Sequence, residues 1–400
     1  MGIELFEKAL PILDTIEKND FEAYFVGGSV RDYIMDRAVH DIDITTSATP
    51  DEIEDMFDHT IPIGREHGTV NVVYQGDNYE VTTFRAESDY VDHRRPSEVY
   101  FVRDLYKDVQ RRDFTINAIA MDKNYKLYDY FEGQDDINHR LIRTVGDAQE
   151  RFSEDALRIL RGLRFQSQLD FIIDKMTYIA MQEQIEDIEH LSIERIVVEL
   201  KKLISGQNVG ESYSNLLTLG LFTHVPFFKD IDMNQVKIET PIRFEMWLAI
   251  IITKCQPQTS LSKLKISNKE KSDIQLYSKI MTVLPQINNK DDLKLCVYDY
   301  GKTNIQEVLN IQSILHANSL ATASPLIINE QTINEIANQL PIQTRKDMNI
   351  NGGDLLNHFQ KKSGPWLKEL LRKVEGAVVI GKVQNTKDEI LKWVDDNVKI

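Results

Sequence analysis

Residues 39–46, VHDIDITT, decide how the rest of this sequence is interpreted. Aspartates alternate with isoleucines here, and successive side chains of a β-strand point to opposite faces. Ile42 and Ile44 would therefore enter a core, while Asp41 and Asp43 would lie close together on the other face. Two such carboxylates repel each other unless a positive charge lies between them. Mg²⁺ is usually held by one or two carboxylates together with substrate phosphates, so the pattern indicates a Mg²⁺ site. The alternative is the polar outer face of an edge strand.

A glycine pair precedes this stretch, in FVGGSVRD (25–32). Gly27 and Gly28 lie between a predicted strand and a helix for which Ser29 is the expected N-cap. Glycines let a phosphate approach the backbone, a helix N-terminus offers free N–H groups to anions, and Arg31 lies in the first turn. A tight turn is the alternative. A phosphate cradle followed by a carboxylate pair is the layout of a phosphoryl-transfer site.

The chain has 400 residues, which suggests several domains, and its net charge is −16. Residues 1–200 carry 22 basic and 42 acidic side chains, whereas residues 201–400 carry 25 and 21. Sixteen of the 19 arginines lie in the first half. Arginine forms forked contacts with phosphates, so the first half is expected to hold a specific polyanion site. The mildly basic second half would suit a nucleic-acid backbone.

The composition is that of a globular protein, with no apolar run long enough for a transmembrane helix. We therefore expect a cytoplasmic protein with no membrane partner. Only Cys255 and Cys296 occur, which argues against a zinc site and against a disulfide framework.

The hydrophobic periodicity predicts a small α/β domain followed by helices nearly to the end of the chain. Residues 1–20 indicate an amphipathic helix, and Thr49 is expected to cap a helix that starts at Pro50. Residues 68–85 indicate a hairpin. Residues 190–204 indicate an amphipathic helix that packs in the core, with Ser192 as its N-cap.

Several motifs together carry a family resemblance. GGSVRD (27–32) with DIDI (41–44), then RRDFTINA (111–118) and EDALRILRGLRF (154–165), follow one another in the order found in one family. The chain resembles the tRNA nucleotidyltransferase/poly(A) polymerase family, in the DNA polymerase β-like superfamily. VDHRRPSEV (91–99) resembles the flexible loop of bacterial CCA-adding enzymes of this family. The remaining helical part resembles the family only in character and length.

The resemblance implies an α+β fold, with a DNA polymerase β-like nucleotidyltransferase head followed by an all-helical neck, body and tail. The expected parts are a catalytic head at 1–145, a nucleotide-selecting neck at 146–205, a body at 206–290 and a tRNA-binding tail at 291–400. It also implies template-independent addition of CCA to the 3′ end of tRNA, from CTP and ATP. The loop at 91–99 favours addition of the whole triplet.

Asp41 and Asp43 would hold one or two Mg²⁺ ions in such an enzyme. Polymerases of this superfamily often have a third carboxylate on a neighbouring strand, and Glu80 in YEVTTF is the candidate here. A glutamate on an ordinary strand face is an equally good interpretation of Glu80.

The segment 111–118 supplies further candidates for nucleotide binding. Arg111 or Arg112 would donate to the triphosphate, because arginine binds phosphate in a bidentate manner. Asp113 would accept a hydrogen bond from a ribose hydroxyl, and Asn117 would support either contact. A helix N-terminus capped by Asp113 is compatible with these roles.

The segment 154–165 is the most informative for specificity. Asp155 and Arg158 are three residues apart and would share a helix face. Asp155 would accept from the amino group of cytosine or adenine, and Arg158 would donate to the ring. Uracil and guanine place a carbonyl there, which leaves a buried acceptor unpaired at a cost of roughly 1–3 kcal/mol. Arg161 and Arg164 would contact phosphate or help to position this pair. A surface salt bridge is the alternative.

Other functions remain open at this stage. A poly(A) polymerase or an enzyme that adds only CC or A would share these motifs. A non-catalytic tRNA-binding protein on a degenerate fold is disfavoured by the presence of both Asp41 and Asp43. A homodimer is also left open by the sequence.

Overall fold

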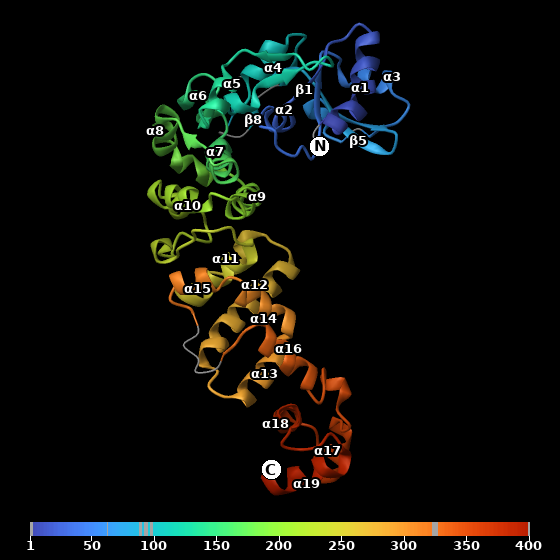
Figure 1. Ribbon diagram of the computed structural model, residues 1–400, viewed down its shortest axis with the longest axis vertical. Helices are drawn as coiled ribbons and strands as arrows, with labels where there is room; N and C mark the ends of the chain where they lie inside the picture. The colour runs from blue at the N-terminus through green and yellow to red at the C-terminus, as the bar shows by residue number, and fades with distance from the viewer. Residues whose placement is uncertain are drawn as a thin grey trace. The chain divides into compact units, whose positions relative to one another are not determined.

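The computed structural model describes residues 3–61, 63–87, 90–91, 95–96, 99–321 and 327–398. Between residues 87 and 99 it describes the backbone of these residues but not their side chains. The chain forms two compact units, residues 1–231 with 238–241 and 259–265, and residues 232–237 with 242–258 and 266–400. Figure 1 follows both along the chain from blue to red. The finer division at residues 145, 205 and 290 stays a prediction.

The first unit contains a mixed seven-stranded sheet with the strand order β11-β10-β1-β2-β5-β4-β3. Its strands are β1 (Ala23–Val26), β2 (Asp43–Thr46), β3 (Thr60–Ile61), β4 (Thr69–Tyr74), β5 (Asp77–Thr83), β10 (Ile119–Met121) and β11 (Leu127–Asp129). β2 is parallel to β5, and the other neighbouring pairs of this sheet are antiparallel. Two short strand pairs are separate from it, β6 (Arg85–Glu87) with β9 (Val99–Phe101) and β7 (Tyr90–Val91) with β8 (Arg95–Pro96). A sheet with helices around it confirms the α+β prediction for the head (Figure 1).

Strand β2 is shorter than the predicted strand at 39–46. Its four residues pair with the four residues of β1, from Ala23 opposite Thr46 to Val26 opposite Asp43. Beyond Val26 the chain turns at Gly27, so β1 offers no partner to the residues before Asp43. Asp41 therefore lies in the approach to the strand rather than within it.

The first three helices test the helix predicted at 1–20 and two predicted N-caps. α1 (Ile3–Lys18) buries one apolar face, which confirms the helix predicted at 1–20. α3 (Pro50–Met56) begins with a capping box in which Thr49 and Glu52 satisfy each other's backbone N–H groups, as predicted for Thr49. The predicted N-cap of α2 (Gly28–Ile34) is wrong, because Gly27 holds that position and the Ser29 hydroxyl donates to the Val26 carbonyl.

The first unit continues mainly as helices. These are α4 (Leu105–Gln110), α5 (Gly133–Asn138), α6 (Ala148–Glu154), α7 (Leu157–Leu169), α8 (Lys175–Glu183), α9 (Ile193–Ile204) and α10 (Val209–Thr218), with a short parallel pair β12 (Leu141–Ile142) and β13 (Ile172–Ile173). α7 is the central helix and packs against both α9 and α10. Gly162 brings α7 close to α8 and to Phe114, because a Cβ at this position would lie 2.5 Å from the Met181 Cε and 2.9 Å from the Phe114 Cζ.

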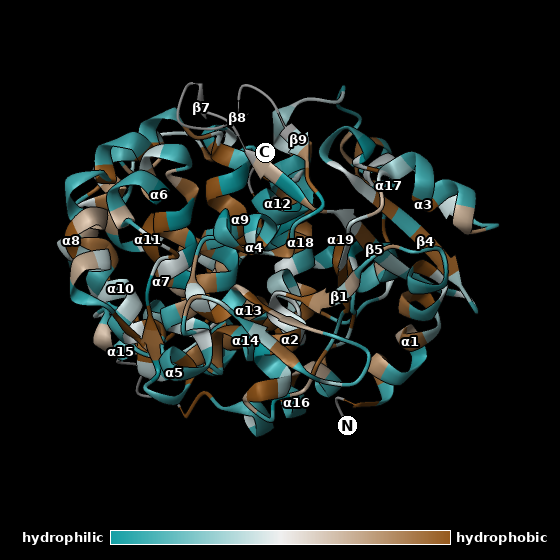
Figure 2. Ribbon diagram, turned by 90° about the horizontal axis from the view of Figure 1, so that it is seen from above, coloured by the Kyte–Doolittle hydropathy of each residue, from teal (hydrophilic) through white to brown (hydrophobic). Residues whose placement is uncertain are grey.

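The second unit is helical throughout its described part. Its helices are α11 (Phe244–Cys255), α12 (Asn268–Val283), α13 (Lys290–Tyr300), α14 (Lys302–Leu309), α15 (Gln312–Ala317), α16 (Glu330–Gln339), α17 (Gly352–Phe359), α18 (Pro365–Ile380) and α19 (Lys387–Asn397). α11 is largely brown in Figure 2 because most of its residues are apolar, and it packs against α12. Among the described residues, no helix combines the length and the apolar character needed to cross a membrane.

Candidate active site

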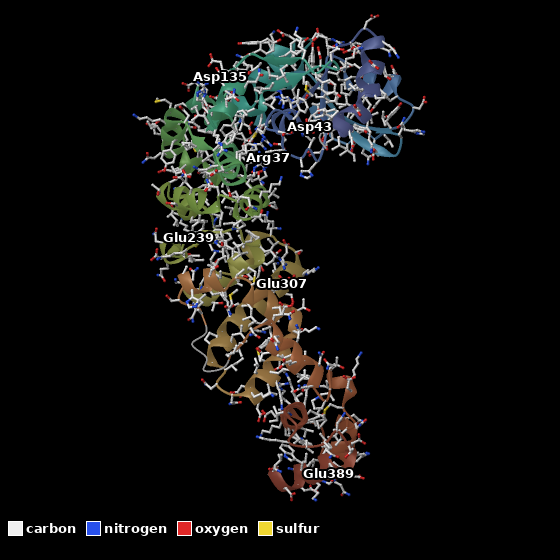
Figure 3. All side chains as sticks on the ribbon, in the orientation of Figure 1. Arg37, Asp43, Asp135, Glu239, Glu307 and Glu389 are labelled. Atoms are coloured by element: carbon white, nitrogen blue, oxygen red, sulfur yellow. The ribbon has the colours of Figure 1, made fainter. Side chains whose placement is uncertain are left out.

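A cavity of about 1090 Å³ lies in the first unit, lined by residues of β1, β2, β5 and α7. It brings together most of the residues that the sequence singles out. These are Gly27, Gly28, Arg31, Asp43, Glu80, Arg111, Arg112, Asp113, Asn117, Asp155, Arg158, Arg161 and Arg164. Asp43 is labelled in Figure 3, and the exposed Asp41 just before it does not line the cavity.

Two carboxylates, of Asp43 and Glu80, meet at the sheet end of the cavity. Asp43 on β2 lies directly opposite Glu80 on the parallel strand β5. Burial, together with the negative charges of Asp41 and Glu80 and against the opposing charge of Arg112, raises the pKa of Asp43 to about 6. Asp43 is therefore close enough to both other acids to be repelled by them.

This donor set fits a divalent cation, whose charge would relieve the repulsion among the carboxylates. Within the described residues, no group of three or more acidic, histidine or cysteine side chains already forms a metal cluster. Further oxygen ligands would come from water or from a bound molecule. Mg²⁺ that is held by only one or two carboxylates commonly takes substrate phosphate oxygens as further ligands.

Gly27 forms the corner between β1 and α2. Its φ of +73° lies in the left-handed region that favours glycine, and a Cβ there would lie 3.3 Å from Arg112 Nη1 and 3.5 Å from Asp43 Oδ2. The bare backbone thus borders both the Asp43 carboxylate and the Arg112 guanidinium. Any side chain at Gly27 would occupy the space between them.

Arg31 is buried and held from two sides. It donates to the Asn117 Oδ1 at 2.8 Å and to the Asp32 Oδ1 at 2.8 Å. Its guanidinium also lies 5.3 Å from the centre of the Phe165 ring. Asn117 therefore orients an arginine of the cavity.

A residue that the sequence analysis missed anchors the next two arginines. Asp108 on α4 is fully buried and accepts from Arg111 at 2.8 Å and from Arg112 at 3.4 Å. It also accepts from the hydroxyl of Thr45 on β2 at 3.3 Å. Burial alone would raise the pKa of Asp108, but the two arginines lower it. The spacing of three and four residues to the two arginines was the available signal.

Buried Asp113 and half-buried Arg161 form an ion pair beside the cavity. The Asp113 Oδ2 accepts from the Arg161 Nε at 2.6 Å, and its Oδ1 accepts from the Phe114 N–H at 2.8 Å. Burial would raise the pKa of Asp113, yet the charge of Arg161 and its hydrogen bond lower it to about 2. Asp113 is thus a fixed anion that holds Arg161 in place.

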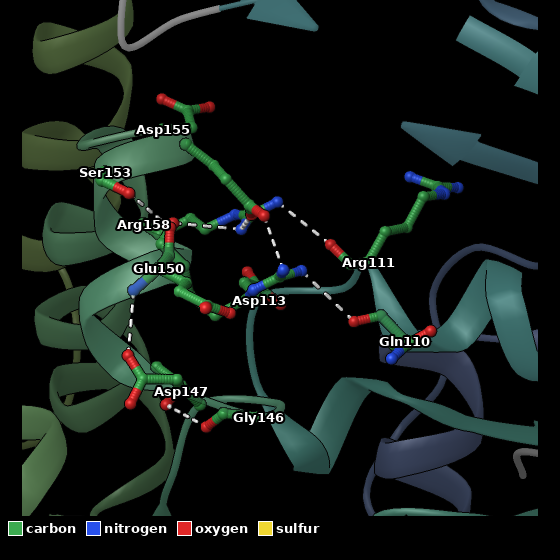
Figure 4. Close-up of polar contacts among 12 residues, drawn as sticks. Gln110, Arg111, Asp113, Gly146, Asp147, Glu150, Ser153, Asp155 and Arg158 are labelled. Carbon is green, nitrogen blue, oxygen red and sulfur yellow. Dashed lines mark hydrogen bonds and ion pairs between the residues drawn. The ribbon is translucent and has the colours of Figure 1, made fainter. Parts of the chain in front are cut away.

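The prediction that Asp155 and Arg158 share one helix face is wrong. The helix is interrupted between α6 and α7, and Asp155 lies in this break with an extended backbone. Its Oδ1 accepts from the Leu157 N–H at 3.0 Å, which turns the chain into α7. Arg158 instead pairs with Glu154. It also donates to the Arg111 carbonyl at 3.0 Å (Figure 4). Both side chains nevertheless line the same cavity.

The helix predicted as core packing at 190–204 has a second role. Ser192 is the N-cap of α9 as predicted, although its side chain makes no capping bond. Arg195 on this helix lines the cavity and donates to the Asp155 Oδ2 at 2.6 Å. Glu199, one turn later and buried, pairs with Arg164 at 3.0 Å. Burial lowers the pKa of Arg164 to about 10, against the negative charge of Glu199. Local sequence gave no signal for either contact.

Eight arginines line the cavity among the described residues, against four carboxylates. They are Arg31, Arg85, Arg111, Arg112, Arg158, Arg161, Arg164 and Arg195. Such an excess of forked cationic donors beside a metal-type carboxylate pair suits a polyphosphate. The side chains of the predicted loop at 91–99 lie outside the described residues, so its role stays a prediction.

Family comparisons agree with this geometry. Residues 23–143 match the poly(A) polymerase head domain, and residues 239–394 match tRNA nucleotidyltransferase domain 2. Residues 170–231 match a family described as a probable RNA and SrmB-binding site of polymerase A. The prediction of a polymerase-type nucleotidyltransferase head is therefore confirmed.

The similarity to curated relatives extends over the whole chain. The chain is 66% identical to the CCA-adding enzyme of Staphylococcus haemolyticus and 60% identical to that of Staphylococcus epidermidis, over 400 residues and the full length of both proteins. The crystal structure of the Bacillus stearothermophilus CCA-adding enzyme in complex with CTP is 32% identical, with a TM-score of 0.82 over 98% of this chain and 97% of that one. The chain therefore belongs to the family of CCA-adding enzymes, which are tRNA nucleotidyltransferases.

Proposed function

We propose that this protein adds C, C and A to the 3′ end of tRNA, from CTP and ATP and without a nucleic-acid template. One observation carries the proposal: a single cavity combines the Asp43–Glu80 carboxylates, an excess of arginines, and Asp155 with Arg158. Membership of the CCA-adding enzyme family supports the same reaction, and the related B. stearothermophilus enzyme binds CTP. Because the substrate is tRNA, we place the reaction in the cytoplasm.

Mg²⁺ is the cation that we assign to the carboxylates. Asp41 and Asp43 would hold it, with Glu80 as the third ligand, and the phosphates of the nucleotide would complete its coordination. When bound, Mg²⁺ would make the RNA 3′-hydroxyl a better nucleophile and neutralise charge on the triphosphate. The repulsion that raises the pKa of Asp43 supports this assignment.

The triphosphate is assigned to the glycine corner and the arginines beside it. Gly27 and Gly28 would let the phosphates lie against the backbone next to Asp43. Arg111 and Arg112, fixed by Asp108, would donate to phosphate oxygens, and Arg31 would do so from α2. These cations stabilise the charge on pyrophosphate as it leaves.

The base is assigned to the α6–α7 break. Asp155 would accept from the amino group that cytosine and adenine share, and Arg158 would donate to a ring nitrogen or carbonyl. Uracil and guanine present a carbonyl instead, at a cost of roughly 1–3 kcal/mol for the unpaired acceptor. Selection then needs no template strand.

The remaining predicted residues act by holding others. Asn117 orients Arg31, and Asp113 holds Arg161. Arg161 and Arg164 lie 5.6 and 4.2 Å from the ring of Phe165, which borders the cavity. A contact of Asp113 with the ribose stays a prediction.

In the reaction, the 3′-hydroxyl oxygen of tRNA attacks the α-phosphorus in line. A new phosphodiester bond forms, the bond from the α-phosphorus to the bridging oxygen breaks, and pyrophosphate departs with both electrons of that bond. The proton of the 3′-hydroxyl passes to water. The residues described above bind and orient both reactants, which converts an encounter in solution into a reaction within one site.

The test is the extension of end-labelled tRNA that lacks CCA, with CTP alone, ATP alone or both, in the presence of Mg²⁺. We expect two additions with CTP alone and one further addition when ATP is also present. Long tails with ATP alone would instead identify a poly(A) polymerase. A reaction that stops after CC or that adds only A would identify a partial enzyme. Binding of tRNA without extension would indicate a non-catalytic protein.

A further inference from the structure

The orientation of Asp155 depends on very few contacts. It lies between α6 and α7, so no helix fixes the direction of its carboxylate. The Leu157 N–H donates to one oxygen at 3.0 Å, and Arg195 Nη2 donates to the other at 2.6 Å. The side chains of Arg195 and Asp155 are only 29% and 18% exposed. With one bond to each oxygen, rotation of the carboxylate is restricted, and the lone pairs that face the cavity are defined.

Arg195 is itself held by a well-packed helix. Its neighbours Ile193, Ile196 and Val197 are buried, and α9 packs along α7. Residues four apart share a helix side, so Arg195 and Glu199 both face residues that line the cavity. Glu199 pairs with Arg164, and Arg195 pairs with Asp155. α9 is therefore a rigid support for charged groups of the cavity.

One donor of Arg195 has no partner. Its Nη1 is buried and makes no hydrogen bond within the described part of the chain. A buried donor without a partner is costly, and an arginine that served packing alone would be expected to satisfy it. An unpaired Arg195 N–H beside a ligand cavity is explained if a bound ligand supplies the missing hydrogen-bond acceptor.

We propose that Arg195 is a specificity-determining positioning residue, which holds Asp155 in the orientation that accepts an amino group of cytosine or adenine. This inference rests on the proposed function, and it adds a residue outside the segment 154–165 to nucleotide selection. Without Arg195, the carboxylate of Asp155 rotates about its remaining bond and no longer presents a fixed set of acceptors.

The first variant is Arg195→Met, which keeps the length of the side chain and removes its donors. We expect kcat/KM for CTP and for ATP to fall by about tenfold to a hundredfold, because the bond to the base is lost in a buried site. The preference for CTP and ATP over UTP and GTP should shrink, while KM for tRNA stays unchanged. Arg195→Lys should restore part of the preference, because one ammonium can still reach Oδ2 as a point charge.

A double-mutant cycle separates positioning from general support of the fold. If Arg195 acts through Asp155, then Arg195→Met made in an Asp155→Asn background should change nucleotide preference little further. The matched control is Lys265→Met, which removes an ion pair of 2.8 Å with Glu194 on the same helix and should leave the preference unchanged.

Three results would overturn the inference. One is a wild-type ratio of CTP and ATP to UTP and GTP in Arg195→Met, another is additive losses in the cycle, and the third is an equal loss in Lys265→Met. Each of these applies only while the wild-type protein adds CCA. A wild-type protein that adds neither C nor A would refute the proposed function itself, so the two failures are distinguishable.

Discussion

The carboxylate of Asp43 opposes folding at the place where we propose a metal ion. Its carboxylate is partly buried, lies opposite Glu80 and near Asp41, and has its pKa raised to about 6 by burial and these charges. Among the described groups that shift the pKa of Asp43, only Arg112 lowers it. Repulsion among carboxylates that a nearby arginine offsets only in part is typical of a site that binds a cation.

The first prediction concerns Asp43→Asn. The variant should lose nucleotide addition by about a thousandfold or more, because loss of a metal ligand removes several kcal/mol of transition-state stabilisation. Its tRNA affinity should not change. Without Mg²⁺, its Tm should equal or exceed that of the wild type, because the repulsion with Glu80 is relieved. Single-turnover extension and thermal unfolding measure the two effects.

The control for this variant is Asp55→Asn, an exposed aspartate on α3 that does not line the cavity. It should retain full activity. Addition of Mg²⁺ should raise the Tm of the wild type and of the control more than that of Asp43→Asn. Near-normal activity of Asp43→Asn would refute the metal assignment.

The second prediction concerns the pH dependence of stability through Asp113. The pKa of Asp113 in the folded protein is about 2, below the ordinary value of 3.8. The ionised form is therefore favoured by folding, and this contribution is present above pH of about 4 and is lost as the pH falls toward about 2. At neutral pH the difference corresponds to about 2 kcal/mol, at 1.36 kcal/mol for each pKa unit.

The measurement is urea unfolding of the wild type and of Asp113→Asn across this range. The free energy of unfolding of the wild type should exceed that of the variant at neutral pH, and the gap should narrow below pH of about 4. A gap that stays constant down to the lowest accessible pH would show that the carboxylate of Asp113 is not held by Arg161 as the structure has it.

Among the elements, strand pairing separates what could be predicted from what could not. The alternation of 41–44 correctly predicts that Ile42 and Ile44 are buried. The pairing of Asp43 with Glu80 is a contact between distant segments, and only the parallel β2–β5 register creates it. The family resemblance suggested Glu80, but only the pairing of the strands in the sheet shows that Glu80 lies opposite Asp43.

The α6–α7 break and α9 mark the other limit of the sequence. Continuous helical periodicity across 154–165 predicted one helix, but the Asp155 carboxylate bonds to the Leu157 N–H and starts a new one. Short polar side chains compete with the helix in this way. Arg195 is an ordinary polar residue of an amphipathic helix until tertiary packing places it on Asp155.

The third prediction compares two glycines inside helices. Gly162→Ala in α7 should destabilise the protein by about 1–3 kcal/mol, because the new Cβ would lie 2.5 Å from Met181 Cε and 2.9 Å from Phe114 Cζ. Gly376→Ala in α18 meets only Leu295 Cδ2 at 3.7 Å and should stabilise it by up to about 1 kcal/mol. Urea unfolding measures both. Equal effects of the two substitutions would contradict the close packing of α7 on Phe114.

At the scale of the whole molecule, charge is distributed unevenly along the chain. Residues 1–200 are strongly acidic overall, yet eight of their 16 arginines line the cavity, whereas residues 201–400 are slightly basic. This distribution predicts a division of roles, because forked arginines suit a triphosphate and lysines suit an RNA backbone. Binding of tRNA by the second half stays a prediction. Which lysines contact tRNA could not be predicted, because no local motif marks a backbone contact.

The fourth prediction follows from this distribution. Binding of tRNA should weaken steeply with salt, by about 10³-fold or more between about 50 and 200 mM if six or more phosphates are contacted. Filter binding of labelled tRNA at several salt concentrations gives the slope. A nearly flat dependence would show that binding does not rely on the phosphate backbone.

The central claim is that protein side chains, with no template, select C and A through Asp155. The most direct test supplies each of the four nucleoside triphosphates singly to tRNA lacking CCA and to tRNA ending in CC, with the wild type and with Asp155→Asn. The wild type should use only CTP on the first substrate and only ATP on the second. The variant should accept UTP and GTP more readily relative to CTP and ATP, because an amide N–H₂ can donate to their carbonyl groups. A variant that keeps the wild-type preference would contradict the claim.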